Sequence, residues 1–300
     1  MMKKWMFMIL AALMIIGLAA CGSDETSSNE GKGKKGSASV GDSVDYKIIG
    51  IDPGAGLMKA TAKVVDEYGL DNWKVVEGSG AAMTAALKKA YEKKEPIIIT
   101  GWTPHWMFAK FDLKYLEDPK GVYGQEETIN TIARNGLKED LPDAHKVLDQ
   151  FNWTPDDMAA VMSAIQAGEK PEVAAAKWVE ENADKVAEWT TGTDKVSGDK
   201  ITLGYVAWDS EIASTNVVGK VLTDLGYKVK LLQVEAGPMW TGVADGSLDA
   251  IVAAWLPSTH EDYYKKYKGK SEDLGENLKG TKLGLVVPAY MDIDSIEDLK

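Results

Sequence analysis

The sequence has few of the residues on which many chemical functions depend. Its 300 residues include one cysteine and three histidines, so no disulfide can form within the chain. Positive charge is also scarce, since 34 Lys and Arg stand against 46 Asp and Glu and give a formal net charge of −12. This balance argues against nucleic-acid binding. There are only 4 Phe but 10 Trp, which favours a role for the indole faces beyond core packing.

Complete catalytic, cofactor or metal motifs are absent from the sequence. It contains no Gly-x-Ser-x-Gly element. His260 and Glu261 begin a zinc-protease pattern, but Tyr264 stands where the second histidine is required. The short glycine pairs at 54–56 and 78–80 lack the third glycine of a dinucleotide loop. We therefore expect neither an enzyme nor a protein that carries a metal or cofactor.

The first segment has the features of an export signal. Lys3 and Lys4 precede an apolar run at 5–20, whose 16 residues are too few for a comfortable bilayer crossing. The run ends in Leu-Ala-Ala directly before Cys21 and so resembles a bacterial lipobox. We predict a signal peptide at 1–20 and a diacylglyceryl anchor on Cys21, which would hold the protein at the extracytoplasmic face of the cell membrane. The alternative is a short membrane anchor with an incidental cysteine.

The following segment, 21–44, is predicted to be a flexible tether. Between 22 and 42 it consists mainly of Ser, Gly, Lys, Glu and Asp, with few apolar side chains to bury.

Beyond the tether, the chain alternates between strand and helix patterns, which indicates an α/β fold. The same order returns after residue 200. Three pairs share an offset of 153 residues: Ile48 with Ile201, Trp102 with Trp255, and Pro104 with Pro257. Chance could produce three such matches, but the repeated order of elements favours two related α/β lobes. The predicted strands are 47–51, 74–77, 96–100, 200–206, 229–234, 249–253 and 283–288, and the predicted helices are 57–68, 82–94, 156–167, 171–189, 209–225 and a short one after Ser295.

Three tryptophans follow predicted strands, at the end where open α/β sheets bind ligands. Trp102, Trp208 and Trp255 would present their faces to a cleft between the lobes. Indole faces attract a quaternary ammonium, which has no N–H to donate. The glycine turn at 54–57 precedes a predicted helix, whose first amides could receive a carboxylate. The alternative is a purely structural role, in which these tryptophans only pack the core and the glycines only form a tight turn.

Four motifs resemble those of the glycine betaine-binding lipoproteins of osmoprotectant ABC importers, the OpuAC type. They are GIDPGAG at 50–56, IIITGWTPHW at 97–106, YVAWDSE at 205–211 and WLPSTH at 255–260. The resemblance extends over essentially the whole chain after the signal peptide. It implies a two-lobed periplasmic-binding-protein-like (type II) fold, circularly permuted, that closes on glycine betaine or proline betaine in the inter-lobe cleft.

The resemblance also implies a role for individual residues. Trp102, Trp208 and Trp255 would surround the ammonium, while the amides of Gly56 and Leu57 and the ring of His260 would meet the carboxylate. One lobe would comprise 45–122 plus 289–300 and the other 123–288. The partners would be the permease and ATPase subunits of an ABC importer, and we expect a monomer.

Some alternatives stay open. Choline, carnitine, another quaternary ammonium or an amino acid could be the ligand, and a purely adhesive lipoprotein is a third class. For His260 the alternative is a surface residue, with His105 as a competitor for the carboxylate. Asp209 is interpreted as a cap of the following helix, and Trp106 and Trp240 as supporting packing.

Overall fold

The computed structural model describes residues 39–300. The predicted signal peptide, Cys21 and most of the predicted tether lie outside the described residues. Among the described helices, none combines the length and the apolar character needed to cross a membrane.

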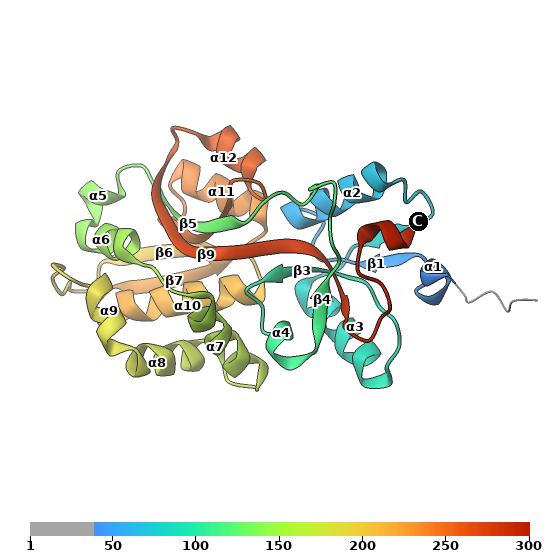
Figure 1. Ribbon diagram of the computed structural model, residues 1–300. Coiled ribbons are helices and arrows are strands. Elements are labelled where there is room, and N and C mark those ends of the chain that lie inside the picture. Colours follow the sequence, from blue (N-terminus) through green and yellow to red (C-terminus); the bar gives the residue numbers. More distant parts are fainter. Residues whose placement is uncertain (1–38) are drawn as a thin grey trace, which may run out of the picture. The chain divides into compact units, whose positions relative to one another are not determined.

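The described chain forms one nine-stranded sheet with helices on both of its faces (Figure 1). The strand order is β2-β1-β3-β9-β5-β8-β6-β7, and β4 pairs with β9 beside this path. The strands are β1 (Lys47–Ile49), β2 (Lys74–Val76), β3 (Ile99–Thr103), β4 (Leu113–Tyr115), β5 (Glu127–Arg134), β6 (Lys200–Tyr205), β7 (Lys228–Gln233), β8 (Ala250–Leu256) and β9 (Ser271–Pro288).

The long strand β9 is shared by two lobes. Its C-terminal part pairs antiparallel with β3 and β4, and its N-terminal part pairs antiparallel with β5. We call β1 to β4 and their helices the first lobe, and β5 to β8 and theirs the second lobe. The fold is thus a two-lobed mixed α/β structure, as predicted.

The two lobes repeat one arrangement of parallel strands. In the first lobe β1 pairs in parallel with β2 and β3, and in the second lobe β6 pairs in parallel with β7 and β8. The peptide bonds Thr103–Pro104 and Leu256–Pro257, which follow β3 and end β8, are both cis. The repeat predicted from the offset of 153 residues is therefore confirmed by the strand order.

Helix ends are set by local sequence. Ser79 caps α3 (Gly80–Lys93) by accepting a hydrogen bond from the amide of Ala82, and Gly69 ends α2 (Gly56–Tyr68) with a left-handed conformation. Thr154 forms a capping box with Asp157 at the start of α7. The remaining helices are α1 (Val40–Ser43), α4 (Met107–Lys110), α5 (Leu137–Asp140), α6 (Pro142–Gln150), α7 (Pro155–Gln166), α8 (Pro171–Glu181), α9 (Ala183–Trp189), α10 (Asp209–Asp224), α11 (Ala236–Asp245), α12 (Glu261–Tyr267) and the 3-10 helix η1 (Ile296–Leu299).

Two local predictions are wrong. The helix expected at 171–189 is broken at Asn182, whose backbone leaves the helical region between α8 and α9. The tether prediction fails at its end, because Ser39 and Asp42 form a capping box that starts α1.

The C-terminal residues return to the first lobe. The Trp73 indole donates a hydrogen bond to the carbonyl of Leu299 at 3.0 Å. The backbones of Glu117 and Ser295 form an isolated parallel β-bridge. Figure 1 shows the C-terminus beside α1 and β1.

Two tryptophans of the segment 171–189, Trp178 and Trp189, belong to the core. Trp178 and Trp189 stack with ring centroids 5.7 Å apart, and Trp189 also meets Phe151 edge to face at 4.9 Å. Trp189 thus packs α9 against α8 and against the end of α6 in the second lobe. Trp189 is therefore a core residue against which the strand-end tryptophans can be compared.

Candidate functional site

Trp102, Trp208 and Trp255 line one small cavity between the lobes. Trp102 lies in β3, Trp255 lies in β8, and Trp208 directly precedes α10. Each side chain is at least nine-tenths buried. The sequence predicted that strand ends would bring these three residues together, and the structure does so. We call this space the indole cavity; its other lining residues are Ile51, Ala55, Leu57, Thr259 and Leu283.

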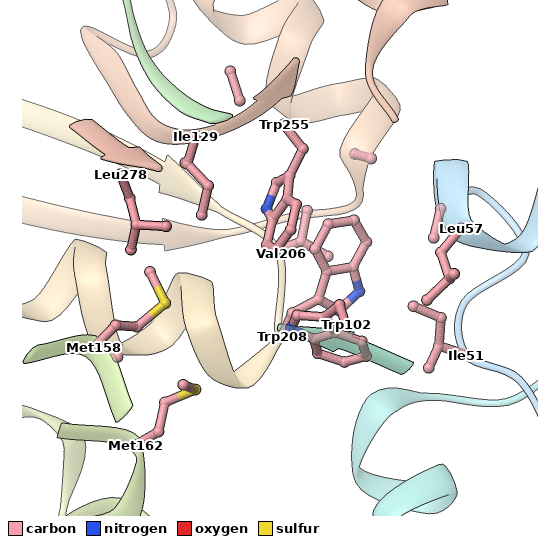
Figure 2. Close-up of a cluster of buried hydrophobic side chains, with 14 of the residues drawn as sticks. Ile51, Leu57, Trp102, Ile129, Met158, Met162, Val206, Trp208, Trp255 and Leu278 are labelled. Atoms are coloured by element: carbon pink, nitrogen blue, oxygen red, sulfur yellow. The ribbon is translucent and has the colours of Figure 1, made fainter. Parts of the chain in front are cut away.

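The indole cavity is apolar and narrow. Figure 2 shows Ile51 and Leu57 of the first lobe facing the indoles of Trp102 and Trp208. The free space is about 20 Å³, little more than one water molecule requires. A larger group can therefore enter only if the lobes or the rings move apart.

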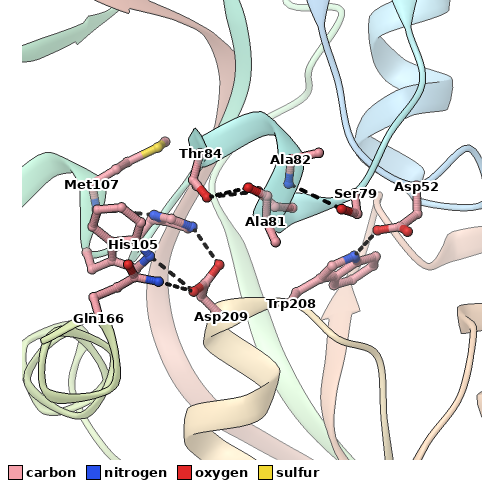
Figure 3. Close-up of polar contacts among 12 residues, drawn as sticks. Asp52, Ser79, Ala81, Ala82, Thr84, His105, Met107, Gln166, Trp208 and Asp209 are labelled. Atoms are coloured by element: carbon pink, nitrogen blue, oxygen red, sulfur yellow. Dashed lines mark hydrogen bonds and ion pairs between the residues drawn. The ribbon is translucent and has the colours of Figure 1, made fainter. Parts of the chain in front are cut away.

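Two of the three indoles donate their N–H to a carboxyl group. Trp208 Nε1 lies 3.1 Å from Oδ2 of Asp52 (Figure 3). Asp52 belongs to the loop after β1, in the opposite lobe. Trp255 Nε1 lies 2.8 Å from Oε1 of Glu211 on α10. Glu211 is fully buried, and burial raises the pKa of its carboxyl to about 8. Sequence reasoning assigned no role to either acid.

The first turn of α2 contacts the second lobe at Thr259. Gly56 and Leu57 are its first two residues, and Ala55 before them makes no side-chain cap, so the helix itself leaves their amides unsatisfied. A Cβ on Gly56 would lie only 2.0 Å from the carbonyl oxygen of Thr259. Glycine is therefore required here to allow the two backbones to approach.

His260 is buried beside the indole cavity. Its ring stacks on Trp208 with centroids 6.0 Å apart, and its Nδ1 accepts the backbone N–H of Trp255 at 3.1 Å. This acceptor role places the proton of the neutral ring on Nε2, which is buried without a protein partner. Burial, with a smaller contribution from Lys59, lowers the pKa of His260 to about 3. His260 is thus a neutral N–H donor and not the surface residue that the alternative interpretation assumed.

The loop that carries His260 is held by Glu127, a buried residue of β5. One carboxylate oxygen of Glu127 accepts the amides of Ser258 and Thr259, both at 2.6 Å, and the other accepts the Thr259 hydroxyl. Charge-assisted hydrogen bonds of this kind fix a loop firmly. No local sequence pattern indicates this contact, because 131 residues separate Glu127 from Ser258.

Asp209 joins the lobes and does not cap its helix. Its Oδ1 accepts Trp106 Nε1 at 3.1 Å and Gln166 Nε2 at 3.3 Å, and its Oδ2 lies 3.4 Å from His105 Nε2 (Figure 3). Burial raises its pKa, but bonding to His105 and the other donors outweighs this, and the net shift is downward. The interpretation of Asp209 as a cap is wrong, because α10 has no side-chain cap and the side chain turns toward α4 and α7.

The lobes also meet at the surface. Lys59 of α2 pairs with Asp262 of α12 at 2.9 Å, and the Tyr263 hydroxyl donates to the carbonyl of Gly54 at 3.4 Å. Exposed pairs of this kind contribute little stability. Together with the contacts of Asp52, Gly56 and Asp209, they show a closed arrangement of the lobes.

Three other residues considered as ligand contacts are buried near the cavity. Trp106, Trp240 and His105 are buried but do not line it. His105 meets Trp102 edge to face at 4.5 Å, and Trp240 meets His260 edge to face at 5.7 Å, so each packs against a ring at or beside the cavity. Among residues 39–300, no group of three or more His, Cys, Asp or Glu side chains could hold a metal ion.

The chain matches one family model over most of its length. Residues 30–181 and 199–300 match the family described as the substrate binding domain of ABC-type glycine betaine transport systems. A relative from Listeria monocytogenes serotype 1/2a (strain 10403S), named glycine betaine/carnitine transport binding protein, is 54% identical over 303 residues, which cover 100% of this chain and 99% of the relative.

Two solved structures are similar to parts of this chain. Lactococcal OpuAC in its closed-liganded conformation with glycine betaine is 49% identical over 53% of this chain and 64% of that one, with a TM-score of 0.48. A choline binding protein of an ABC transporter, in complex with choline, is 27% identical over 62% of this chain and 61% of that one, with a TM-score of 0.46.

Proposed function

Because this chain belongs to the family of substrate-binding domains of ABC-type glycine betaine transport systems, we propose that its indole cavity receives the quaternary ammonium of glycine betaine. The family binds and delivers a substrate and is not a family of enzymes. The observation that carries the proposal is the convergence of three indoles from both lobes on one cavity, next to the first turn of a helix.

The cation is recognised by the ring faces. A trimethylammonium group has no N–H, so hydrogen bonds cannot hold it, whereas the faces of Trp102, Trp208 and Trp255 attract it. Each desolvated ring contributes about 1 to 2 kcal/mol, and three rings about 3 to 6 kcal/mol. This attraction alone makes a weak binder, so the carboxylate of the ligand must add to it.

The carboxylate is recognised by N–H groups at the edge of the cavity. The amides of Gly56 and Leu57 have no partner within α2, and Nε2 of His260 is an unpartnered donor. Hydrogen bonds to a charged group contribute about 1.5 to 3 kcal/mol each. After the costs of association, a site in the micromolar range, about −8 kcal/mol, is expected.

The ligand bridges the lobes. The first lobe supplies Trp102 and the turn at 56–57, and the second supplies Trp208, Trp255 and His260. Because the closed cavity is so narrow, the ligand enters when the lobes part and is enclosed when they meet again. In the proposed division, the first lobe comprises 45–122 plus 289–300 and the second 123–288.

Carnitine is a second candidate ligand, and proline betaine a third. The Listeria relative is named for both glycine betaine and carnitine, and carnitine likewise joins a trimethylammonium to a carboxylate. Its longer chain would need a wider separation between the indoles and the amide turn. Choline has the cation without the carboxylate, so it would leave the Gly56 turn and His260 without a partner.

The protein works outside the cytoplasm with an importer. A substrate-binding protein of an ABC importer presents its ligand to the permease from the extracytoplasmic side. We further propose that Cys21 is lipidated and holds the protein, as a monomer, at the outer surface of the cell membrane, where it takes up osmoprotectant. The sequence supports this by the apolar run that ends at the single cysteine.

The test is a ligand titration monitored by tryptophan fluorescence. The purified protein is titrated with glycine betaine, carnitine, choline and proline at several salt concentrations. A saturable change with glycine betaine and none with proline supports the proposal. A response to choline as strong as that to glycine betaine would remove the carboxylate subsite, and no response to any quaternary ammonium would refute the proposal.

A further inference from the structure

The edges of the indoles reveal a feature that ring packing alone does not require. Trp208 and Trp255 both donate their N–H to a carboxyl group, from Asp52 and Glu211. The two acids differ in environment: Asp52 is half-buried in the loop before α2, whereas Glu211 is fully buried. Of the two side chains, only that of Asp52 is in contact with solvent.

We propose that Asp52 determines specificity for charge: its carboxylate, at the edge of the Trp208 indole, makes the cavity prefer a quaternary ammonium to an uncharged group of the same shape. The inference rests on the proposed function, since it concerns the same ligand. Asp52 acts on the cation through space and through the ring, without touching it.

The physical basis is the field of a carboxylate in a nearly dry site. A negative group that accepts an indole N–H adds to the negative potential on the ring face, where a cation sits. A carboxylate at the ring edge lies roughly 7 Å from a cation on the face, and the Coulomb attraction at an intermediate dielectric is then equivalent to roughly fiftyfold in affinity. Because Asp52 is only half-buried, solvent screening reduces the expected effect to about tenfold.

Glu211 provides an internal contrast. It makes the same type of hydrogen bond to Trp255, but burial raises its pKa to about 8, so the carboxyl is mostly neutral at pH 7. Glu211→Gln preserves an acceptor for the indole and changes little charge. At pH 7 it should therefore alter the preference for a cation less than Asp52→Asn does.

Asp52 also joins the two lobes, so loss of affinity for glycine betaine alone would not separate charge from closure. The measurement is therefore a ratio. The dissociation constant of 3,3-dimethylbutanoate, in which carbon replaces the ammonium nitrogen, is divided by that of glycine betaine. A structural role weakens both ligands alike and leaves the ratio unchanged, whereas a role in charge recognition lowers it.

The experiment compares wild type, Asp52→Asn and Glu211→Gln at pH 7 by calorimetry, with the weaker ligand measured by competition. Asp262→Asn is the matched control, because it removes another carboxylate that joins the lobes, but at the exposed surface. Asp52→Ser is a second charge-removing variant in case Asp52→Asn fails to fold.

The expected result is a ratio about tenfold lower in the Asp52 variants, with a smaller fall in Glu211→Gln and none in Asp262→Asn. A ratio in the Asp52 variants within about threefold of wild type, or an equal fall in Asp262→Asn, would overturn the inference. If wild type itself fails to bind glycine betaine, the proposed function is refuted instead, so the two failures are distinguishable.

Discussion

Replacing Gly56 by alanine should abolish tight ligand binding without unfolding the protein. The added Cβ would lie 2.0 Å from the Thr259 carbonyl oxygen and 2.7 Å from its carbon. An ordinary contact needs at least about 3.4 Å, so the first turn of α2 and the loop at 256–260 must separate by about 1.4 Å. Because both neighbours are backbone atoms, no side-chain rotation can relieve the contact.

The magnitude follows from what the separation removes. A ligand held by Trp208, Trp255 and His260 would lose its hydrogen bonds to two amides of α2, which contribute about 1.5 to 3 kcal/mol each. The loss of about 3 to 6 kcal/mol corresponds to at least about 100-fold in the dissociation constant. Folding should be spared, because the lobes can separate while each keeps its own core.

The assay is calorimetric titration with glycine betaine, together with thermal unfolding. Gly54→Ala is the matched control: Gly54 lies in the same turn, and a Cβ there meets nothing within 4 Å. We expect Gly54→Ala to bind like wild type and Gly56→Ala to unfold at a similar temperature. Wild-type affinity in Gly56→Ala would refute the reasoning, since the bound form would then not need the Gly56 to Thr259 contact.

Three further predictions concern single side chains. Trp255→Ala should weaken glycine betaine binding at least about tenfold. Trp189→Ala, a core change expected to cost about 3 to 5 kcal/mol of stability, should leave the affinity of the folded fraction unchanged. Equal effects on affinity would contradict the assignment of the indole cavity as the ligand site. Because His260 has its pKa lowered to about 3, it stays neutral from pH 8 to pH 6. In the Glu211→Gln protein, which lacks the titration of Glu211 in this range, the affinity measured by calorimetry should therefore be the same at both pH values; a tenfold loss would count against the donor role of His260. The pKa of Glu211 is raised from 4.5 to about 8, so between these pH values the folded state binds one more proton than the unfolded state. The free energy of unfolding, measured in urea, should therefore fall by a few kcal/mol at most as pH rises from about 5 to 8. The fall should be smaller in Glu211→Gln, and an identical slope in both proteins would contradict the assignment.

The positions of the parallel strands along the chain were predictable from the sequence because such strands leave local signals, whereas β4 and β5 were not predicted. Buried apolar runs such as 96–100 and 249–253 mark the strands, and the tryptophans that follow them mark the ends at which ligands bind. The convergence of Trp102, Trp208 and Trp255 followed from this placement and is seen in the structure. That these residues and Gly56, Leu57 and His260 contact the ligand stays a prediction.

The contacts that support the site were not predictable in the same way. Asp52 and Trp208 are 156 residues apart, and Asp209 and Trp106 are 103 apart, so each pair depends on how the lobes close. Asp209 at the start of a helix matches a capping pattern, but its tertiary partners outweigh that local preference. Only the end of β9, 283–288, was predicted, because its first half carries charged residues and lacks a continuous apolar run.

The pairing of β9 has a consequence for the order in which the protein folds. Strand β3 in the first lobe is completed by residues 282–286, and the paired residues are 179 to 187 positions apart in the chain. A chain that emerges N-terminus first therefore presents β3 with an open edge until almost all of it has emerged, and such edges invite pairing with other chains. The first lobe begins the sequence but is completed only near its end, so β3 depends on protection from aggregation through most of the synthesis and export of the chain.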